Sequence, residues 1–503
     1  MSFLRRYLAP SIIAVAISSL YLYHLDGVGL LGPDEPRYAA IGRAMAETGN
    51  LITPSLWGAP WFEKPPLLYW MVAAATATGL NPDRAARVPV ALLSFAFLGL
   101  SFWLLWREFD VEVATLSTAL LATSAGWITY SGLCLTDLPL AVFFSLAVFL
   151  GLPLLRDQPE LALINRRIFL IGVCVGLATL AKGLVPLALC LPFFWFLRRF
   201  WRRWWLAFLS CAIVAAPWYV AVYVSNGNQF VEDFFWKHHV QRLYSASLQH
   251  VQPWYYYFPV LLAGLFPWTP LLGVFATRRA VWDERRRFLA SAFCFGVLLF
   301  SISLNKLPGY LLPLFPAIFV LLASQFEGKS ATRVDRLWLL LAALLVSSIP
   351  LLARLLPEWL SRGRLSSLPI RPFLEPNLLY MVVPVLLVFV ARRSWIVLLL
   401  VVCIAWGGIY LKDSAYPILD RKVSARGLWR DIKAVSNKIC DGGLDREWQY
   451  GLAFYHGSPV PYCSPGKFDF VLRPRPHQPP SIEPLNENAG RFQVSAGGKE
   501  RSK

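Results

Sequence analysis

The chain has 503 residues, of which 56% are hydrophobic and only 16% carry a charge, and its mean hydropathy is +0.50. This balance lies outside the range of soluble globular domains and is typical of a protein with many membrane spans. The formal net charge is +18, but the lysines and arginines lie between apolar runs long enough to cross a bilayer. Their placement excludes nucleic acid as the partner of this charge.

Apolar runs of about 17 to 25 residues predict about thirteen membrane-spanning helices. The runs lie at residues 8–25, 88–106, 111–129, 137–155, 166–182, 184–197, 205–224, 257–277, 288–304, 309–324, 337–356, 377–391 and 395–411. The sequence therefore predicts an α-helical polytopic membrane protein.

Positive charges predict the orientation of these spans, because lysine and arginine concentrate in cytoplasmic connections. With the N-terminus inside, every alternate connection is basic. The residues concerned are Arg5, Arg6, Arg107, Arg156, Arg166, Arg167, Arg198, Arg199, Arg202, Arg203, Arg278, Arg279, Arg285, Arg286, Arg287, Lys329, Arg333, Arg336, Arg392 and Arg393. The segment after Leu411 is then expected outside. The first apolar run could also belong to a cleaved signal peptide, but Ala9 to His24 is long for one and no clear small-residue cleavage site follows, so we expect an uncleaved anchor.

Charged residues gather in the outer connections and at the helix ends that face them. They are Asp34, Glu35, Arg37, Glu63, Lys64, Asp137, Lys182, Lys237, His238, His239, Arg242 and Lys306. Charged groups at membrane depth are costly and usually mark a functional site. Their convergence on one face predicts a single outer pocket.

Each of these residues is also compatible with an ordinary structural role. Asp34 and Glu35 are typical of the start of a helix, here predicted from Pro36 to Glu47. The stretch WFEKPPLLYW, Trp61 to Trp70, is compatible with an interfacial aromatic belt. Asp137 is equally typical of a helix cap, Lys182 and Lys306 of lysines at the membrane interface, and His238 and His239 of loop histidines. Charged residues with unrelated structural roles would be expected on both faces of the membrane, so their clustering on one face favours a functional site.

The stretch GPDEPRYAAIGRAMAETGNLITPSLWGAPWFEKPPLLYW closely resembles the first outer loop of the bacterial aminoarabinose transferases. These are membrane enzymes of glycosyltransferase family 39 and relatives of the protein O-mannosyltransferases. The resemblance extends through LTDLP, LAKG, the aromatic loop ending in HHVQR, and NKLPGYLLPLFP. It covers most of the membrane part, whereas the C-terminal part is a shorter and poorer match.

The resemblance implies a GT-C type, inverting glycosyltransferase that uses a sugar on a polyprenyl phosphate, expected to be undecaprenyl phosphate. It also implies a multi-pass protein of the bacterial inner membrane, with its active face in the periplasm. The implied acceptor is lipid A or a related envelope molecule. The same donor chemistry would serve a protein O-glycosyltransferase. A lipid-linked sugar flippase is a third possibility, but it predicts inverted repeats and midplane charges that the sequence does not show convincingly.

The resemblance also implies three groups of site residues. The catalytic group is Asp34, with Asp137 as the second acid. The group that binds the donor and its phosphate is Lys64, Arg242, Lys182, Lys306 and Arg37. The group that can bind a divalent metal such as zinc is Glu63 and His239, with the adjacent His238 as the alternative ligand.

These residue types suit glycosyl transfer from a lipid phosphate. An ionised Asp34 can accept the proton of the acceptor hydroxyl, and general-base help of this kind contributes about 10² to 10⁴ in rate. The departing phosphate needs positive charge that stays in place. Lys64, on a turn stiffened by Pro65 and Pro66, supplies one such charge, and Arg242 can bind phosphate oxygens bidentately.

The composition predicts three parts of the chain. Residues 1–411 form the transmembrane glycosyltransferase domain, with a first periplasmic loop at 26–66, and residues 412–473 form a small periplasmic α/β cap. Within the cap, SARGLWRDIKAVSNKIC predicts a short amphipathic helix, EWQYGLAFYHGSPVPYC predicts two strands around a Gly-Ser-Pro turn, and KFDFVLRP predicts another strand. Residues 474–503 have little to bury and are expected to be disordered.

Six of the eight cysteines lie in or beside apolar helices, where cysteine acts as a small hydrophobe. Cys440 and Cys463 both fall in the predicted periplasmic cap, where oxidation is permitted. We therefore expect a disulfide between them.

Overall fold

The computed structural model describes residues 2–157, 159, 161–240, 251–278, 282–327, 332–362, 378–390, 393–464, 467–476 and 478–485. The predicted site residue Arg242 and the side chains of His238 and His239 lie outside this description.

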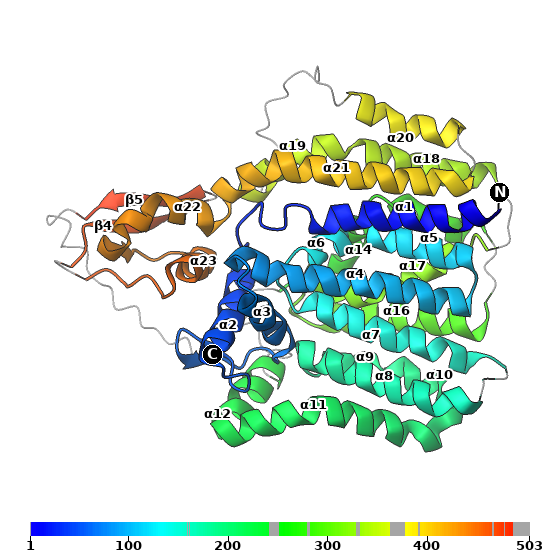
Figure 1. The fold of residues 1–503 in the computed structure, drawn as a ribbon, viewed down its shortest axis with the longest axis horizontal. Coiled ribbons are helices and arrows are strands. Elements are labelled where there is room, and N and C mark those ends of the chain that lie inside the picture. Colours follow the sequence, from blue (N-terminus) through cyan, green and yellow to red (C-terminus); the bar gives the residue numbers. More distant parts are fainter. Residues whose placement is uncertain are drawn as a thin grey trace. The chain divides into compact units, whose positions relative to one another are not determined.

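The chain is mainly helical (Figure 1). The α-helices are α1 (Ser2–Leu22), α2 (Asp34–Thr48), α3 (Leu67–Ala77), α4 (Pro82–Glu108), α5 (Val111–Ala122), α6 (Ala125–Ser131), α7 (Asp137–Gly151), α8 (Leu161–Lys182), α9 (Val185–Leu189), α10 (Leu191–Phe196), α11 (Trp204–Asn226), α12 (Asn228–Phe230), α14 (Tyr257–Gly264), α15 (Val274–Thr277), α16 (Glu284–Ile302), α17 (Phe315–Ser324), α18 (Arg333–Ser347), α19 (Ile349–Arg362), α20 (Leu378–Val390), α21 (Arg393–Lys422), α22 (Ala425–Ile432) and α23 (Arg446–His456). The 3-10 and π segments are η1 (Leu152–Leu155), η2 (Arg198–Arg203), η3 (Val231–Val240), η5 (Trp254–Tyr256), η6 (Thr269–Gly273), η7 (Pro308–Leu314) and η8 (Lys433–Lys438). The strands are β1 (Ser55–Leu56), β2 (Ala59–Pro60), β3 (Ile439–Asp441), β4 (Phe470–Arg475) and β5 (Gln478–Pro484).

The chain divides into two compact units, and the division falls within α2 and again within α21. The first unit comprises Met1–Asp26, Tyr38–Arg354 and Pro369–Ser414. The second comprises Gly27–Arg37, Leu355–Leu368 and Ala415–Lys503. The C-terminal segment of the second unit thus begins at Ala415, near the predicted boundary at residue 412. It also contains two segments that the sequence analysis assigned to the membrane domain.

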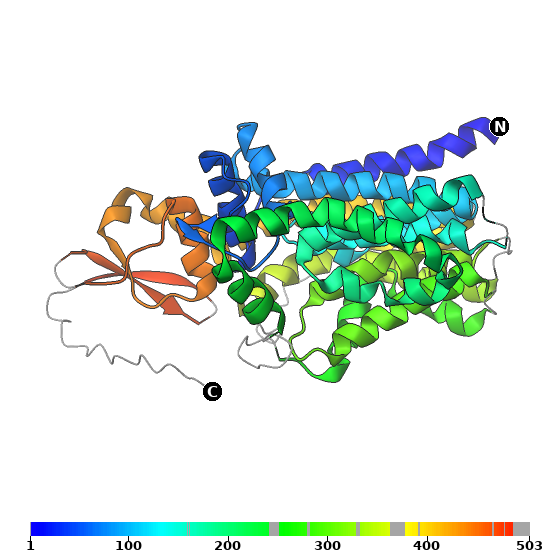
Figure 2. The same cartoon turned by 90° about the horizontal axis from the view of Figure 1, so that it is seen from below.

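The first unit is a bundle whose long helices run in nearly the same direction, as Figure 1 and the perpendicular view in Figure 2 both show. Among its described residues, five helices are long and apolar enough to cross a membrane, or up to eight if each bent pair counts as one span. The pairs α5–α6, η5/α14–η6/α15 and α18–α19 bend by 65°, 113° and 51°. The chain is therefore a multi-pass membrane protein.

Each predicted apolar run falls on a helix or on a pair of consecutive helical segments. The predicted number of about thirteen spans stays a prediction, because several of these helices are shorter than a bilayer crossing. The apolar helix α3 follows the first loop directly and has no counterpart among the predicted runs. At 11 residues it is too short to span, which explains why a search for long runs passed over it.

Ion pairs hold together the helix ends that the sequence analysis placed on the cytoplasmic side. Glu108, the last residue of α4, has a side chain only 2% exposed and pairs with Arg156 and Arg285, each at 3.0 Å. Asp283 pairs with Arg285 at 2.7 Å and with Arg286 at 2.9 Å. Because a buried charge is stable only when it is paired and hydrogen-bonded, this cluster fixes the ends of α4 and α16 to each other and to the segment after η1.

Two further pairs extend the same arrangement. Arg286 of α16 pairs with Glu327, just after α17, and Arg278 pairs with the buried Asp335 of α18. Asp335 also forms a capping box with Thr332 at the start of α18. Four of the predicted cytoplasmic arginines, Arg156, Arg278, Arg285 and Arg286, are thus paired with acids.

The second unit contains a three-stranded sheet in the order β3–β4–β5, in which β3 pairs parallel with β4 and β4 pairs antiparallel with β5. The helices α22 and α23 pack beside it, and the core includes Leu428, Ile432, Trp448, Leu452 and Leu472. The predicted disulfide is confirmed: Cys440 and Cys463 are bonded, with their Cα atoms 4.8 Å apart. The amphipathic helix and the strand in KFDFVLRP are also confirmed as α22 and β4.

Two predictions for this unit are wrong. The stretch predicted as two strands is mostly the helix α23, which buries Trp448, Leu452 and their neighbours on one face and ends at Gly457 with a φ of 92°. The aromatic residues favour strands locally, but the helical spacing of the buried positions decides the structure. The start of the predicted disordered tail is the strand β5, in which prolines are tolerated because it lies at the sheet edge.

The ion cluster gives a stability prediction. Glu108→Gln removes the negative charge that faces two arginines, and a hydrogen bond to a charged group contributes about 1.5–3 kcal/mol. We expect a clearly lower melting temperature of the detergent-purified protein, followed by tryptophan fluorescence. The matched control is Glu284→Gln, whose side chain is 57% exposed and pairs with Arg287 at 3.5 Å. Equal melting temperatures for both variants would contradict the importance of the cluster.

Candidate functional site

Asp34 is the first residue of α2 and lies in the second unit. Its carboxylate forms an ion pair with the guanidinium of Arg37, one helical turn further on. The side chain of Asp34 is 42% exposed, whereas that of Arg37 is 9% exposed. The positive end of the helix dipole and the buried guanidinium both lie on one side of the carboxylate, while its exposed side stays accessible.

The helix start that carries Asp34 is built from local contacts. Gly32 adopts a φ of 61°, a backbone conformation that side chains rarely allow, and so permits the turn into α2. Glu35 is 1% exposed, and its carboxylate accepts the N–H of Leu31 at 2.8 Å. Glu35 is therefore a structural acid, while its neighbour Asp34 is the accessible one. The helix predicted from Pro36 to Glu47 is confirmed as α2.

Glu63 and Lys64 lie in the first unit, on the turn between β2 and α3. The Lys64 ammonium is 3.1 Å from the Glu63 carboxylate, and both side chains are only about a tenth exposed, at 10% and 11%. Pro65 and Pro66 follow directly, and Pro66 is the residue at which α3 begins. This stiff turn holds a largely buried cation next to an acid.

Asp137 and Lys182 form a second buried pair in the first unit. Asp137 begins α7, Lys182 ends α8, and the Lys182 ammonium donates to the Asp137 carboxylate at 2.5 Å. The signs of both charges match the helix dipoles at these ends. The same ammonium lies 4.5 Å from the ring centroid of Tyr310, a cation–π contact that lowers the cost of burying it.

The approach of η7 to Asp137 depends on Gly309. A Cβ atom at this position would lie 2.3 Å from the Asp137 carboxylate oxygen and 2.8 Å from the ring of Tyr130. Such distances are too short for any side chain without movement of the carboxylate. The glycine therefore lets η7 bring Tyr310 to the ion pair.

One apolar cluster links three of the predicted site segments of the first unit. It consists of Phe62, Leu180, Ala215, Trp218, Val222, Phe230 and Phe234. Phe62 directly precedes Glu63, and Leu180 lies just before Lys182 on α8. Phe234 belongs to η3, the segment that leads to the two predicted histidines. Packing of these aromatic side chains therefore fixes the backbone on which the charged residues stand.

Lys306 is buried, at 4% exposed, between α16 and η7. Its ammonium donates to the backbone carbonyls of Ser303 at 2.6 Å and Gln252 at 3.0 Å. A backbone bridge between Val251 and Asn305 lies beside it. The visible role of Lys306 is to join two backbone segments, and its predicted contact with phosphate stays a prediction.

Two aromatic residues of these sites had no place in the sequence prediction. Tyr310 contacts Lys182, and the ring of Tyr450 lies 5.4 Å from the Arg37 guanidinium. Tyr310 stands in the motif NKLPGYLLP, beside the glycine that the packing requires. Nothing in the sequence connects either ring to its cation, because the partners are far apart along the chain.

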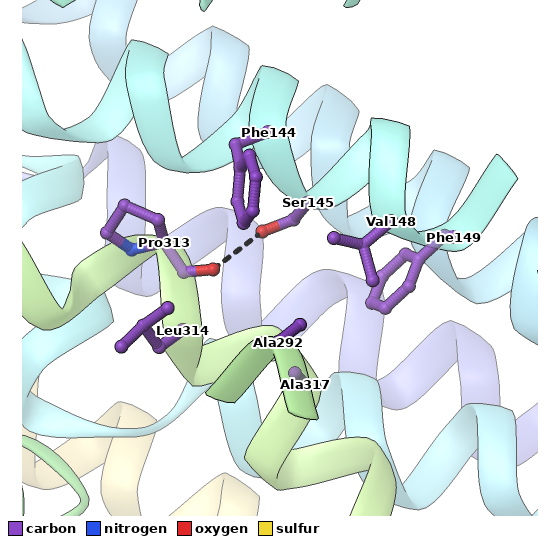
Figure 3. A pocket seen from close by; sticks show the side chains of 8 residues that line it. All are labelled: Phe144, Ser145, Val148, Phe149, Ala292, Pro313, Leu314 and Ala317. Atoms are coloured by element: carbon purple, nitrogen blue, oxygen red, sulfur yellow. Dashed lines mark hydrogen bonds between the residues drawn. The ribbon is translucent and has the colours of Figure 1, made fainter. Parts of the chain in front are cut away.

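An apolar pocket in the first unit is separate from these charged pairs (Figure 3). Its lining residues are Phe144, Ser145, Val148, Phe149, Ala292, Pro313, Leu314 and Ala317. The single hydroxyl in this lining, that of Ser145, donates to the carbonyl of Pro313 at 3.2 Å. The pocket therefore offers packing space between α7, α16 and α17, and no reactive group.

Comparisons with known proteins support the resemblance. The dolichyl-phosphate-mannose-protein mannosyltransferase family matches residues 12–281. The undecaprenyl phosphate-alpha-4-amino-4-deoxy-L-arabinose arabinosyl transferase of Pseudomonas aeruginosa UCBPP-PA14 is 33% identical over 320 residues, which are 60% of this chain and 57% of the relative. The protein of the same name from Pectobacterium carotovorum PC1 is 32% identical over 361 residues, 67% of this chain and 63% of the relative. The matches thus span less than two thirds of the length of these relatives.

The fold has a solved counterpart. The crystal structure of ArnT from Cupriavidus metallidurans bound to undecaprenyl phosphate superposes with a TM-score of 0.70 at 24% identity, covering 89% of this chain and 84% of ArnT. Its apo structure gives the same TM-score and identity. The α-helical polytopic GT-C fold expected from the resemblance is confirmed. With a family match over more than half of its length, the chain belongs to the dolichyl-phosphate-mannose-protein mannosyltransferase family.

Proposed function

We propose that the protein is an inverting glycosyltransferase that moves a sugar from undecaprenyl phosphate to lipid A or a related envelope acceptor. The observation that carries this proposal is the placement of Asp34: an accessible carboxylate at the start of α2, paired with a buried arginine. Relatives at about a third identity are named as arabinosyl transferases that use such a donor. We place the reaction at the periplasmic face of the bacterial inner membrane, where the basic connections put these helix ends.

In this reaction the acceptor hydroxyl attacks the anomeric carbon of the donor sugar. The new carbon–oxygen bond forms as the bond from that carbon to the phosphate oxygen breaks, and the polyprenyl phosphate leaves with the electron pair. Asp34 accepts the hydroxyl proton on its exposed side, while Arg37 holds its other side. Attack from the face opposite the phosphate inverts the anomeric configuration.

Buried cations stabilise the departing phosphate in this proposal. Lys64 and Lys182 are held in place by Glu63 and Asp137, so they need no reorganisation when negative charge develops. Asp137 acts as the second acid by fixing Lys182. Arg37 and Lys306 complete the proposed donor-binding set, together with Arg242, which lies outside the described residues.

A second candidate function is transfer of the same sugar to a protein hydroxyl. The family match favours it, because the family is described as acting on proteins. The donor chemistry and the role of Asp34 would be the same. The acceptor is therefore what an experiment has to identify.

A divalent metal such as zinc, bound by Glu63 and His239, is a further proposal. The described residues fit it poorly, since Glu63 already pairs with Lys64 and no group of three acids, histidines or cysteines suited to a metal occurs among them. One carboxylate with one histidine is also a small ligand set for zinc. We derive no catalytic step through a metal.

The function is tested by mass spectrometry of lipid A and of total glycoproteins from the host. The host carries the intact gene, a deletion of the gene, or the gene for the Asp34→Asn variant. The matched control is Asp469→Asn, which changes an exposed acid of the second unit. We expect the deletion and Asp34→Asn to remove the same sugar mass from lipid A, because general-base loss costs about 10² to 10⁴ in rate. Loss from a protein would move the acceptor to the second candidate. No change in either pool would contradict glycosyl transfer to these acceptors and leave a flippase as the alternative.

A second prediction concerns the fit around Asp137. Gly309→Ala places a methyl group against its carboxylate and pushes the Lys182 pair apart, so we expect turnover of undecaprenyl-phosphate sugar to fall by about 10²-fold. The control is Gly99→Ala on α4, where an added Cβ meets no atom within 4 Å. The measurement is turnover of purified variants in detergent. Equal activity of the two variants would show that this fit does not matter for the reaction.

The metal proposal is tested by metal content. Purified wild type, Glu63→Gln and His239→Ala are dialysed against trace zinc and analysed by inductively coupled plasma mass spectrometry. A site formed by Glu63 and His239 would give about one zinc per wild-type chain and would lose most of it in both variants. A metal-free wild type with full turnover would remove the metal from the mechanism.

A further inference from the structure

Three consecutive backbone amides just before α2 each donate to a side chain. The N–H of Gly29 donates to the Asp420 carboxylate at 2.7 Å, and the N–H of Leu30 donates to the Tyr455 hydroxyl at 3.0 Å. The N–H of Leu31 donates to Glu35 at 2.8 Å. Two of the three acceptors come from the C-terminal part of the second unit, 391 and 425 residues away in sequence.

Asp420 is the strongest of these acceptors. Its side chain is 6% exposed and forms ion pairs with Arg426 at 2.9 Å and Arg430 at 3.0 Å. Hydrogen bonds to a carboxylate are about twice as strong as those between neutral groups, so the bond from the Gly29 N–H is the strongest of the three together with that to Glu35. Asp420 thus ties the segment before α2 to the start of α22.

The segment before α2 also packs closely against the C-terminal residues that accept its hydrogen bonds. An added Cβ at Gly29 would lie 2.1 Å from the Ser424 hydroxyl oxygen and 2.7 Å from the Tyr455 hydroxyl. Leu31 and Ser424 form a backbone bridge at the same place. The requirement for glycine at position 29 therefore comes from the chain segment that it faces.

The far end of the segment has its own contact with the same part of the unit. The Arg37 guanidinium, which pairs with Asp34, lies over the ring of Tyr450 at 5.4 Å. Tyr450 and Tyr455 both belong to α23. One helix therefore contacts the segment before and after Asp34.

We propose that Asp420 and Tyr455 are positioning residues that hold Gly27–Arg37, and with it Asp34, in the geometry for reaction. This inference rests on the proposed role of Asp34 as the base. It gives the C-terminal part of the protein a direct task in turnover, in addition to any task in choosing the acceptor.

The anchoring is tested by hydrogen–deuterium exchange of the full-length protein in detergent. Asp420→Asn weakens the acceptor for Gly29, and Tyr455→Phe removes the hydroxyl that accepts from Leu30. The matched controls are Asp469→Asn, on a side chain 56% exposed, and Tyr462→Phe, on a tyrosine 74% exposed. We expect exchange in the peptide covering Gly27–Arg37 to be about tenfold faster in the two test variants and unchanged in the controls.

Positioning is tested by the kinetics of the same four variants. A displaced base should lower kcat by about 10- to 100-fold, with a smaller change in the KM of the donor through Arg37 and with Tyr455→Phe keeping the wild-type melting temperature. Unchanged exchange in both test variants would overturn the anchoring. Faster exchange with normal kcat would overturn the positioning.

Failure of the proposed function gives a different result. In that case the wild type has no transferase activity, or Asp34→Asn keeps it, while the exchange experiment still reports whether Asp420 and Tyr455 hold the segment.

Discussion

The pair between Asp137 and Lys182 shows the constraint on which the rest of the structure depends. A charge buried in an apolar bundle is tolerated only next to an opposite charge, so the start of α7 and the end of α8 must lie at the same level. Gly309 and Tyr310 add a close backbone and an aromatic face to this pair. The helix ends are thus arranged around charges, and the apolar helix bodies provide the packing between them.

Burying charge is equally costly at the Glu108 cluster, but the charges there are arranged differently. There the arginines are neutralised by several acids from neighbouring helices, and the result is a set of closed ion pairs. Lys64 pairs with Glu63 and Lys182 with Asp137, and these lysines lie on a stiff turn and at a helix end. Each of these pairs joins two side chains, whereas the Glu108 cluster joins the ends of several helices.

The long helices and the disulfide were predictable from residue patterns, and the wrong predictions have physical causes. Long apolar runs predict helices because bilayer thickness sets their length, and the disulfide follows from the two cysteines outside those runs. The helix α23 was missed because its aromatic residues favour strands, and β5 was missed because its prolines favour disorder. The partners of Lys306 and Arg37 were not predictable, since backbone carbonyls and a distant tyrosine carry no signal in the local sequence.

The anchoring of Gly27–Arg37 also bears on why the C-terminal part is the poorer match to relatives. The family match ends at residue 281, well before the segments that contact Gly29 and Leu30. To hold those amides, the C-terminal part needs an acidic oxygen and a hydroxyl at two places and space opposite one glycine. Hydrogen bonds to backbone place few demands on the surrounding sequence. The remaining surface of this part is therefore free to differ in sequence without loss of these bonds.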